Sequence, residues 1–415
     1  MDSPPVSVLV VDDSAFMRNL IGRIVEAEPD MVLAGKAMNG LFALQKLEKL
    51  APDIIILDIE MPEMNGIEFL EERRKQNVEI PVVILSSLVE RGARVTMTAL
   101  ALGASDFVLK PSGPDSEDLH LIAEQLTHMI RSYGRQYQNR RRMLQTGDAE
   151  FQSPPGAATL PGSTRTPQNP AQLTSSAPTV RSPRFESALP SRTEDIAAPR
   201  RAAPEATIES LIAARNAGPH ASEPIAAVAI GISTGGPNAL RRVFAEIDPD
   251  LGLPVLVVQH MPAGFTEEFA RSLDRICPLE VREAREGDLL KPGRILIAAG
   301  DKHLRVEKLR LGVVARLGDE AAVNGHRPSV DVLFDSVAKV FGAGTLAVIM
   351  TGMGRDGAQN LGQILTAGGV TIGQDQASSI VYGMPRVAWE KGHVQLQMPL
   401  DQVSGAISRL AREFR

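Results

Sequence analysis

The sequence predicts an α/β protein with two domains, each built on a mainly parallel sheet that helices cover. Short runs of apolar residues alternate with segments of helical periodicity, which is typical of such sheets. A stretch rich in Pro, Ser, Ala and Arg separates two groups of these runs, and 415 residues suffice for about two or three domains. We therefore expect a first domain over residues 1–133, a linker over 134–222 and a second domain over 223–415.

Four apolar runs of the first domain are predicted to be buried parallel strands. They span residues 8–11, 53–58, 81–87 and 106–109. Helical periodicity from residue 15 to about residue 28 follows the first run, and apolar positions between 119 and 130 predict a helix after the last. Most of these runs end in polar residues, so the functional groups are expected at the edge of the sheet where the strands end.

The segment between the domains has the composition of a disordered chain. Ten prolines punctuate residues 154–204, among many Ser, Thr, Ala and Arg residues and few large apolar ones. Such a segment cannot bury enough apolar surface to offset the entropy lost on ordering, so we predict a flexible linker with a short helix around 208–215. The role of a simple spacer is favoured over that of a docking segment.

The second domain repeats the pattern of buried strands and helices. Strands are expected over residues 226–232, 254–259, 294–298, 345–350 and 370–373. Helices are expected over residues 265–275, 330–341 and 359–366. Residues 304–317, with Gly312 in the middle, predict a β-hairpin instead of a strand–helix–strand unit.

The composition excludes several classes of protein. The formal net charge is −6, and the basic cluster at 140–142 is too short to indicate nucleic-acid binding. Cys277 is the only cysteine, so no disulfide can form within the chain. No basic run precedes the apolar stretch at 6–11, which is too short for a signal peptide or a membrane span, so we expect a cytoplasmic protein.

Three carboxylates follow strands of the first domain. Asp12 and Asp13 come after the first run and Asp58 ends the second, while Lys110 follows the last. Three carboxylates in one crevice repel one another unless a cation lies between them, and a set of oxygen ligands favours Mg²⁺. Lys110 adds a point charge that suits a phosphoryl oxygen.

These residues resemble the receiver domain of two-component response regulators, over about residues 6–131. The match includes the Asp pair, Asp58, the loop Met-Pro-Glu-Met-Asn-Gly at 61–66, Ser86 and Lys110-Pro111. The resemblance implies a flavodoxin-like fold and a histidine kinase as phosphodonor. It also implies that Asp58 is the phosphoacceptor and that Asp12, Asp13 and Asp58 hold Mg²⁺, together with the backbone carbonyl of Glu60.

The same resemblance assigns the residues that would respond to phosphorylation. Lys110 would contact the phosphoryl group, Ser86 would be the switch hydroxyl and Phe107 the switch aromatic residue. The neighbouring Ser87 is an alternative for the hydroxyl. Phosphorylation of Asp58 would add about two negative charges and draw the Ser86 hydroxyl inward.

In the second domain, Gly231-x-Ser233-x-Gly235 follows an apolar strand and opens a helix. This is the spacing of a nucleophile elbow, although a glycine-rich turn could equally hold a phosphate. His260 follows the next strand at the same edge of the sheet, and is therefore favoured as a general base. The alternatives are His220, His303, His326 and His393, of which His326 is the strongest.

The segment at 352–357 contains Gly352-x-Gly354-x-x-Gly357, which formally matches a dinucleotide-binding turn, and Asp375 follows at a suitable distance. The nucleotide interpretation is rejected on charge, because Asp356 would lie inside the phosphate-binding turn and repel a pyrophosphate. Asp356 is instead well placed to orient an imidazole and to stabilise its cationic form.

The second domain resembles the catalytic domain of the chemotaxis methylesterases, from about residue 225 to 415. The likeness includes the segments at 231–236, 259–262, 322–331, 351–357 and 383–385. It implies a doubly wound, mainly parallel α/β fold, with Ser233 as nucleophile, His260 as general base and Asp356 as the orienting acid. The backbone amide of Met353 is an oxyanion candidate, and no cofactor is implied for the esterase step.

A receiver followed by an esterase is the domain order of this family, which implies a phosphorylation-activated enzyme that demethylates glutamate methyl esters of chemoreceptors. Deamidation of glutamines is also implied, and contact with the membrane only through receptors. The linker is longer than is common in the family, which leaves the coupling between the domains open. A non-catalytic docking module is the rival hypothesis, and Ser233, His260 and Asp356 together argue against it.

Overall fold

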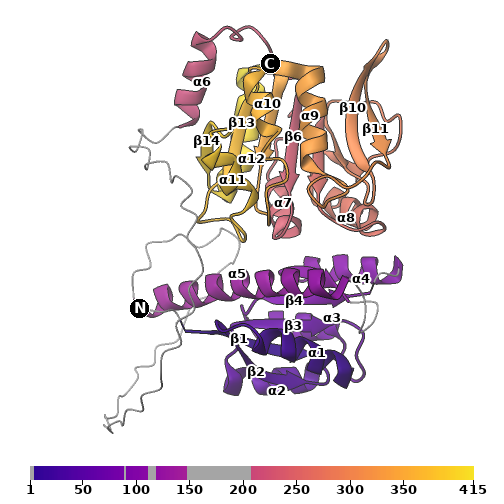
Figure 1. The fold of residues 1–415 in the computed structure, drawn as a ribbon, viewed down its shortest axis with the longest axis vertical. Coiled ribbons are helices and arrows are strands. Elements are labelled where there is room, and N and C mark those ends of the chain that lie inside the picture. The colour runs from indigo at the N-terminus through magenta and orange to yellow at the C-terminus, as the bar shows by residue number, and fades with distance from the viewer. Residues whose placement is uncertain (1–3, 88–89, 111–117, 147–206) are drawn as a thin grey trace, which may run out of the picture.

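The computed structural model describes residues 4–87, 90–110, 118–146 and 207–415, which form two α/β domains. The domains are stacked along the long axis of the molecule, with the N-terminal domain below the C-terminal one in Figure 1. Most of the expected linker lies in residues 147–206, outside the described residues. None of the helices in the described parts of the chain is both long and apolar enough to cross a membrane.

The N-terminal domain is a five-stranded parallel sheet with the order β2-β1-β3-β4-β5. Its strands are β1 (Val6–Val11), β2 (Met31–Ala37), β3 (Ile54–Asp58), β4 (Val82–Ser86) and β5 (Asp106–Leu109). Its helices are α1 (Ala15–Glu26), α2 (Gly40–Leu50), α3 (Gly66–Lys75), α4 (Glu90–Ala101) and α5 (Asp118–Thr146). All four predicted strands are confirmed. β2 was not predicted, because this edge strand is only partly buried and lacks a continuous apolar run.

Three helices of this domain begin just beyond the edge where the strands end. The Ser14 hydroxyl accepts from the Met17 N–H at the start of α1, and the Asn39 side chain caps α2. Asn65 and Glu68 form a capping box on α3. Because these caps fix where each helix starts, they also fix the short loops that carry the acidic residues.

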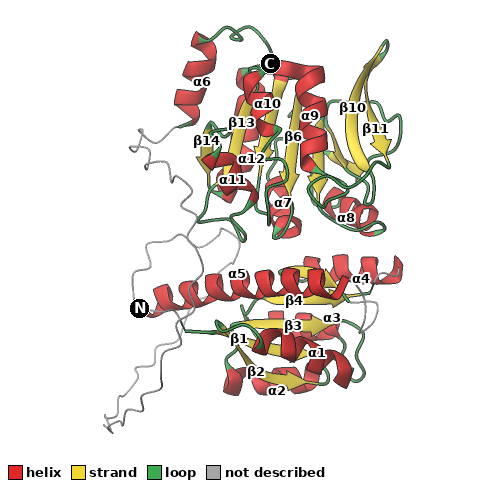
Figure 2. Ribbon diagram, viewed as in Figure 1, coloured by secondary structure: helices red, strands yellow, loops and turns green. Residues whose placement is uncertain are grey.

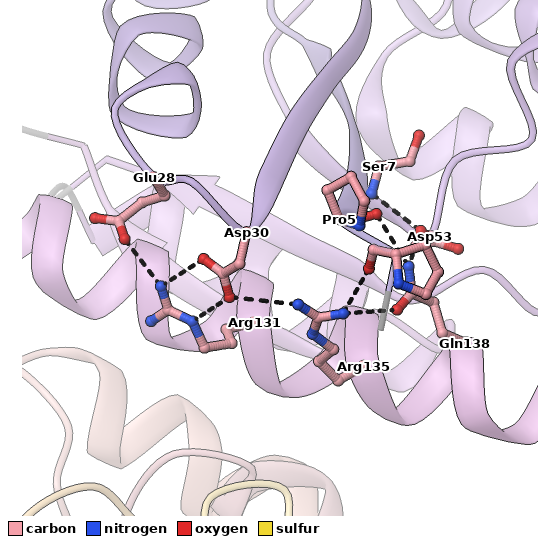
Figure 3. A network of polar contacts seen from close by, with 9 residues as sticks. Pro5, Ser7, Glu28, Asp30, Asp53, Arg131, Arg135 and Gln138 are labelled. Carbon is pink, nitrogen blue, oxygen red and sulfur yellow. Dashed lines mark hydrogen bonds and ion pairs between the residues drawn. The ribbon is translucent and has the colours of Figure 1, made fainter. Parts of the chain in front are cut away.

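Helix α5 extends past the expected domain boundary at residue 133 and remains part of the N-terminal domain (Figure 3). The Arg131 guanidinium binds Glu28 and Asp30, whose carboxylates lie 2.9 and 2.8 Å away. Farther along, the Gln138 amide donates to Asp53 Oδ2 at 2.7 Å and to the Pro5 carbonyl. These contacts attach the helix to the loops that precede β1, β2 and β3. They lie at the end of the sheet where the strands begin, and the acidic loops lie at the end where the strands stop.

The C-terminal domain is a seven-stranded parallel sheet with the order β14-β13-β12-β6-β7-β9-β8, plus a separate hairpin. Its strands are β6 (Ala227–Ile232), β7 (Val255–Gln259), β8 (Glu280–Glu283), β9 (Arg294–Ile297), β10 (His303–Leu309), β11 (Gly312–Gly318), β12 (Thr345–Ile349), β13 (Val370–Gln374) and β14 (Leu396–Met398). The hairpin and the five expected strands are confirmed. The outer strands β8 and β14 were missed because they are short and, in β8, mostly charged.

Helices cover both faces of this sheet (Figure 2). They are α6 (Ile208–Ala217), α7 (Gly236–Ala245), α8 (Phe265–Asp274), α9 (Val330–Phe341), α10 (Leu361–Thr366), α11 (Met384–Glu390) and α12 (Leu400–Glu413), with a 3-10 turn at Gly342–Gly344. The predicted short helix, α6, lies within the segment expected to be linker but packs on this domain. Its buried Arg215 donates to the carbonyls of Ala343 and Gly368.

The two domains contact each other through α4 and β5 on one side and α7 and α8 on the other. The rings of Phe107 and Phe265 stack with centroids 5.1 Å apart. The Asn238 side chain donates to the carbonyls of Ala104 and Ser105, both at 2.9 Å. This domain interface therefore joins the start of β5 directly to the helices that follow β6 and β7.

Candidate active site

Ser233 lies in a tight turn between β6 and α7. Its N–H donates to the Thr351 carbonyl at 3.0 Å, and its own carbonyl accepts from Gly236. Gly235 has a φ of 81° and directly precedes the helix, a conformation that a side chain would strain. The turn is therefore a strand–turn–helix elbow, which the spacing of the glycines predicted.

Three segments that are distant in the sequence bring Ser233, His260 and Asp356 into one hydrogen-bonded chain. His260 Nδ1 lies 3.0 Å from Ser233 Oγ, and His260 Nε2 lies 2.8 Å from Asp356 Oδ2. A carboxylate only accepts, so Nε2 carries the proton and Nδ1 can accept from the serine hydroxyl. The three residues follow β6, β7 and β12, which are neighbours in the sheet.

Asp356 is almost fully buried and is surrounded by donors. Asp356 accepts from Ser329 Oγ at 2.7 Å, from the Val330 N–H at 2.6 Å and from Asn324 Nδ2 at 2.9 Å. Burial by itself would raise the pKa of this carboxyl. The hydrogen bond and charge of His260, with the bonds from Asn324 and Ser329, outweigh burial and hold the pKa well below its usual range. Asp356 therefore stays ionised and able to hold the imidazole.

Two backbone N–H groups near Ser233 have no partner among the described residues. No described residue accepts a hydrogen bond from the N–H of Thr234, which follows Ser233, or from that of Met353. Donors of this kind are what a tetrahedral acyl intermediate requires. The role of Met353 stays a prediction, and Thr234 is a second candidate that the elbow rule identifies.

Gly352, the first glycine of the segment at 352–357, has a role that does not involve a nucleotide. A Cβ at Gly352 would come within 2.8 Å of the Ser233 Cβ and 2.4 Å of the Met384 sulfur. Glycine at this position lets the loop that carries Asp356 pass close to Ser233. The absence of a side chain at Gly352 therefore allows the loop at 351–357 to approach the turn that contains Ser233.

The acidic residues of the N-terminal domain also converge. Oxygen atoms of Asp12, Asp13 and Asp58 lie within 4.8 Å of one another, with Asp12 and Asp58 buried and Asp13 exposed. Lys110 Nζ lies 2.8 Å from Asp58 Oδ2 and 3.1 Å from Asp12 Oδ2. A cluster of hard oxygen ligands with one open side fits Mg²⁺. Burial raises the pKa of Asp58, although Lys110 opposes this rise.

Two known families match the chain. A model of the response regulator receiver domain matches residues 8–124, and a model of the CheB methylesterase domain matches residues 228–407. A protein-glutamate methylesterase/protein-glutamine glutaminase of Treponema denticola is 52% identical over 99% of both chains. The chain belongs to the CheB methylesterase family.

Two further proteins are similar to the whole chain or to one of its domains. The protein of the same name from Treponema pallidum is 48% identical and covers 99% of this chain and 98% of its own. The crystal structure of the Thermotoga maritima CheB methylesterase catalytic domain is 36% identical, with a TM-score of 0.44, and covers 46% of this chain and 99% of that one.

The other candidate histidines of the chain lie in different surroundings. His220 pairs with Glu223, His303 is held between the Ser329 N–H and the Ala321 carbonyl, and His393 Nδ1 donates to the Ala358 carbonyl. Among the described histidines, only His260 bonds to Ser233. His326 lies against His260 but does not bond to it.

The two residues expected to respond to phosphorylation lie in different surroundings: Ser86 lines a pocket with Asp58 and Lys110, whereas Phe107 faces the other domain. Ser86 Oγ is 2.7 Å from Thr96 Oγ1 on α4 and is buried. Phe107 is buried and stacked on Phe265 of the methylesterase domain. Glu60 is exposed next to Asp58, which is compatible with its expected use of a backbone carbonyl.

The receiver domain reaches the nucleophile elbow directly. Asp106 Oδ2 accepts from the Gly235 N–H at 2.8 Å, and Asp106 is buried. Ser233 is only 9% exposed and the His260 side chain 8%. Ser233 and His260 therefore offer little surface to a substrate in this arrangement.

Asp106 should make the stability of the molecule depend on pH. Burial raises its pKa from 3.8 to about 6, so its contribution to stability is complete below pH 3.8 and is lost as the pH rises through 6. The loss corresponds to roughly 3 kcal/mol. Asp106→Asn keeps an oxygen that can accept from Gly235 and should remove this dependence. Thermal unfolding of both chains between pH 4 and 7 measures it, and parallel pH curves would contradict the assignment.

Proposed function

We propose that the protein is a phosphorylation-activated serine hydrolase that demethylates glutamate γ-methyl esters of chemoreceptors. The observation that carries this proposal is the relay from Ser233 through His260 to Asp356, with the receiver domain bonded to the same turn through Asp106. The names of the relatives support the substrate class, since both Treponema proteins are called protein-glutamate methylesterases and protein-glutamine glutaminases. We propose glutamine deamidation as a second activity of the same site.

In the proposed mechanism, Ser233 Oγ attacks the ester carbonyl while its proton passes to His260 Nδ1. Asp356 accepts from Nε2 throughout and stabilises the imidazolium that forms. The N–H groups of Thr234 and Met353 bind the oxyanion. The C–O bond to the methoxide then breaks, His260 gives its proton to the methoxide, which leaves as methanol, and a glutamyl ester remains on Ser233.

Hydrolysis of this ester returns the enzyme to its starting state. A water molecule replaces methanol in the cleft and loses a proton to His260 as it attacks the acyl carbon. The C–O bond to Ser233 breaks, the serine takes up the proton and glutamate is released. A glutamine side chain follows the same route with ammonia as the leaving group, so no cofactor is required for either substrate.

For the receiver domain we propose that Asp58 accepts a phosphoryl group from a histidine kinase. Asp12, Asp13, Asp58 and the Glu60 carbonyl would hold Mg²⁺, which neutralises charge on the phosphoryl oxygens. Lys110, already 2.8 Å from Asp58, would bind one of those oxygens. The Ser86 hydroxyl would leave Thr96 for the phosphoryl group.

This movement has a direct route to the esterase site. Thr96 lies on α4 and Phe107 on β5, and both elements take part in the domain interface. A shift of Phe107 away from Phe265, together with loss of the Asp106 bond to Gly235, would uncover Ser233. We therefore propose that the unphosphorylated enzyme is closed and that phosphorylation favours an open form.

The regulatory part of the proposal is tested by methanol release from receptor-bearing membranes carrying methyl esters. Mg²⁺ with a small phosphoryl donor should raise the rate of the full chain by about 5- to 150-fold, the usual range of coupling between sites. Asp58→Asn should abolish this rise. Glu72→Gln, on the exposed face of α3, is the matched control and should respond like the wild type. An undiminished response in Asp58→Asn would refute the proposal.

The proposed partners follow from the two domains. The receiver domain implies a kinase as phosphodonor, and the methylesterase domain implies methylated receptors. We propose that the protein works in the cytoplasm and meets the membrane only through those receptors. No contact with nucleic acid is proposed, because the net charge is −6.

A further inference from the structure

His326 lies flat against the ring of His260. The two ring centroids are 3.7 Å apart and the ring planes differ by 13°. No described residue hydrogen-bonds to the ring nitrogens of His326, so its contact with the relay is made by the face of the ring. The mechanism above gives this side chain no role, although it touches the proposed base.

A tight turn places His326 in this position. Asn324 and Gly325 have φ angles of 54° and 81°, and Val323 and His326 exchange backbone hydrogen bonds across them. Two successive positive φ angles define a type I′ turn, for which Asn-Gly is the preferred pair. Asn324 Nδ2 also bonds Asp331 and Asp356, at 2.7 and 2.9 Å. One turn therefore supports both His260, through His326, and Asp356.

The hydrogen bonds of the relay leave one motion of His260 weakly restrained. Both bonds are made at the ring nitrogens. When the ring rotates about the line between Nδ1 and Nε2, the lengths of these bonds hardly change, so only their angles resist the rotation. A flat surface in contact with one face of the ring opposes that rotation directly. Misplacement of a reacting group by about 1 Å can cost about 100-fold in rate.

We infer that His326 is a positioning residue for the esterase step: its neutral ring holds the His260 imidazole in the plane of the relay and supports its cationic form. This inference rests on the proposed function. A neutral aromatic ring attracts a cation placed over its face. The attraction arises only when His260 takes the serine proton, so it favours the transition state over the ground state.

The surroundings of His326 keep its ring neutral. Burial, and next the charge of His260, lower its pKa to about 4, and Asp356 opposes this only partly. The other acidic group nearby is Asp331, which reaches the site through Asn324. His326 therefore stays uncharged at neutral pH, so the proton that His260 takes from the serine does not meet a second cation.

A pair of substitutions separates the ring face from the nitrogen atoms. His326→Phe keeps a flat ring of similar shape without polar atoms, and His326→Gln keeps polar atoms without a ring. Both are measured in the full chain with Mg²⁺ and phosphoryl donor, on a receptor-derived peptide that carries a glutamate γ-methyl ester. His326→Phe should keep kcat within about threefold, whereas His326→Gln should lose about 10- to 100-fold in kcat with little change in KM.

Every other pattern overturns the inference. Equal rates in the two variants, a better glutamine than phenylalanine variant, or a loss expressed in KM would show that the ring face does not act as described. His220→Gln, a surface histidine paired with Glu223, is the matched control and should match the wild type. If the glutamine variant does not fold, His326→Leu replaces it, with similar bulk and no ring. A wild-type chain that releases no methanol refutes the proposed function instead.

Discussion

Replacing Ser233 by alanine should lower methanol release from a glutamate methyl ester peptide by about 10⁴- to 10⁶-fold. In the proposed mechanism Ser233 acts as a unit with His260 and Asp356, and loss of one member of such a unit removes nearly all of its benefit. The hydrogen bonds that shape the elbow use the backbone of Ser233, so they survive the substitution. Turnover is measured with phosphoryl donor present, and thermal unfolding checks that the chain remains folded.

The matched control for this prediction is Ser404→Ala. Ser404 is buried on α12 and its hydroxyl has no partner among the described residues, so its removal should leave turnover unchanged. Turnover of Ser233→Ala within about tenfold of the wild type would show that another group attacks the ester.

Asp356→Asn should lower kcat by about 10⁴-fold, as the matching change does in serine proteases. An asparagine amide turned toward His260 donates where the carboxylate accepts, which places the imidazole proton on the wrong nitrogen. The substitution also removes the charge that stabilises the imidazolium. Because Asp356 accepts from Ser329 and Val330, the variant should also be less stable, and kcat is compared only among chains folded at the assay temperature.

Asp335→Asn provides the control for charge alone. Asp335 lies on α9 and pairs with Lys339 at the surface, so its loss should change kcat less than twofold. A kcat of Asp356→Asn within tenfold of the wild type would mean that the 2.8 Å contact with His260 is structural and not part of the reaction.

The predicted relay could be located from sequence because it uses the ends of buried strands. Ser233, His260 and Asp356 each follow an apolar run, and parallel strands deliver such residues to one edge of a sheet. The central strands have continuous apolar runs, so their positions were predictable to within about two residues. The edge strands β2, β8 and β14 lack such runs and were missed.

The residues that contact and hold the relay could not be derived from the pattern of neighbouring residues in the sequence. Asn324, Ser329 and His326 come from the segment between the hairpin and α9, and they meet Asp356 and His260 only in the folded domain. The Asn-Gly pair at 324–325 is a recognisable turn signal, but nothing in it indicates which residues the turn will touch.

The contacts between the domains were equally hidden. The resemblance to receiver domains singled out Phe107, but not its stacking on Phe265, and the sequence gives no sign that Asp106 would bond to the elbow. The extent of α5 was also underestimated, because its last turns carry the basic residues at 140–142 and few apolar ones. These last turns are attached to the domain by the ion pairs of Arg140 with Glu79 and of Arg141 with Asp53, and both acidic residues are distant in sequence.

The most direct test of the closed, phosphorylation-opened esterase is the rate at which a fluorophosphonate probe labels Ser233. The full chain is treated with the probe, with and without Mg²⁺ and phosphoryl donor, and the modified peptide is identified by mass spectrometry. The label should appear on Ser233 alone, slowly in the untreated chain and at least several-fold faster after phosphorylation, but not faster in Asp58→Asn. Absence of label on Ser233, as a non-catalytic docking module would give, or equal rates in both states, would contradict the account.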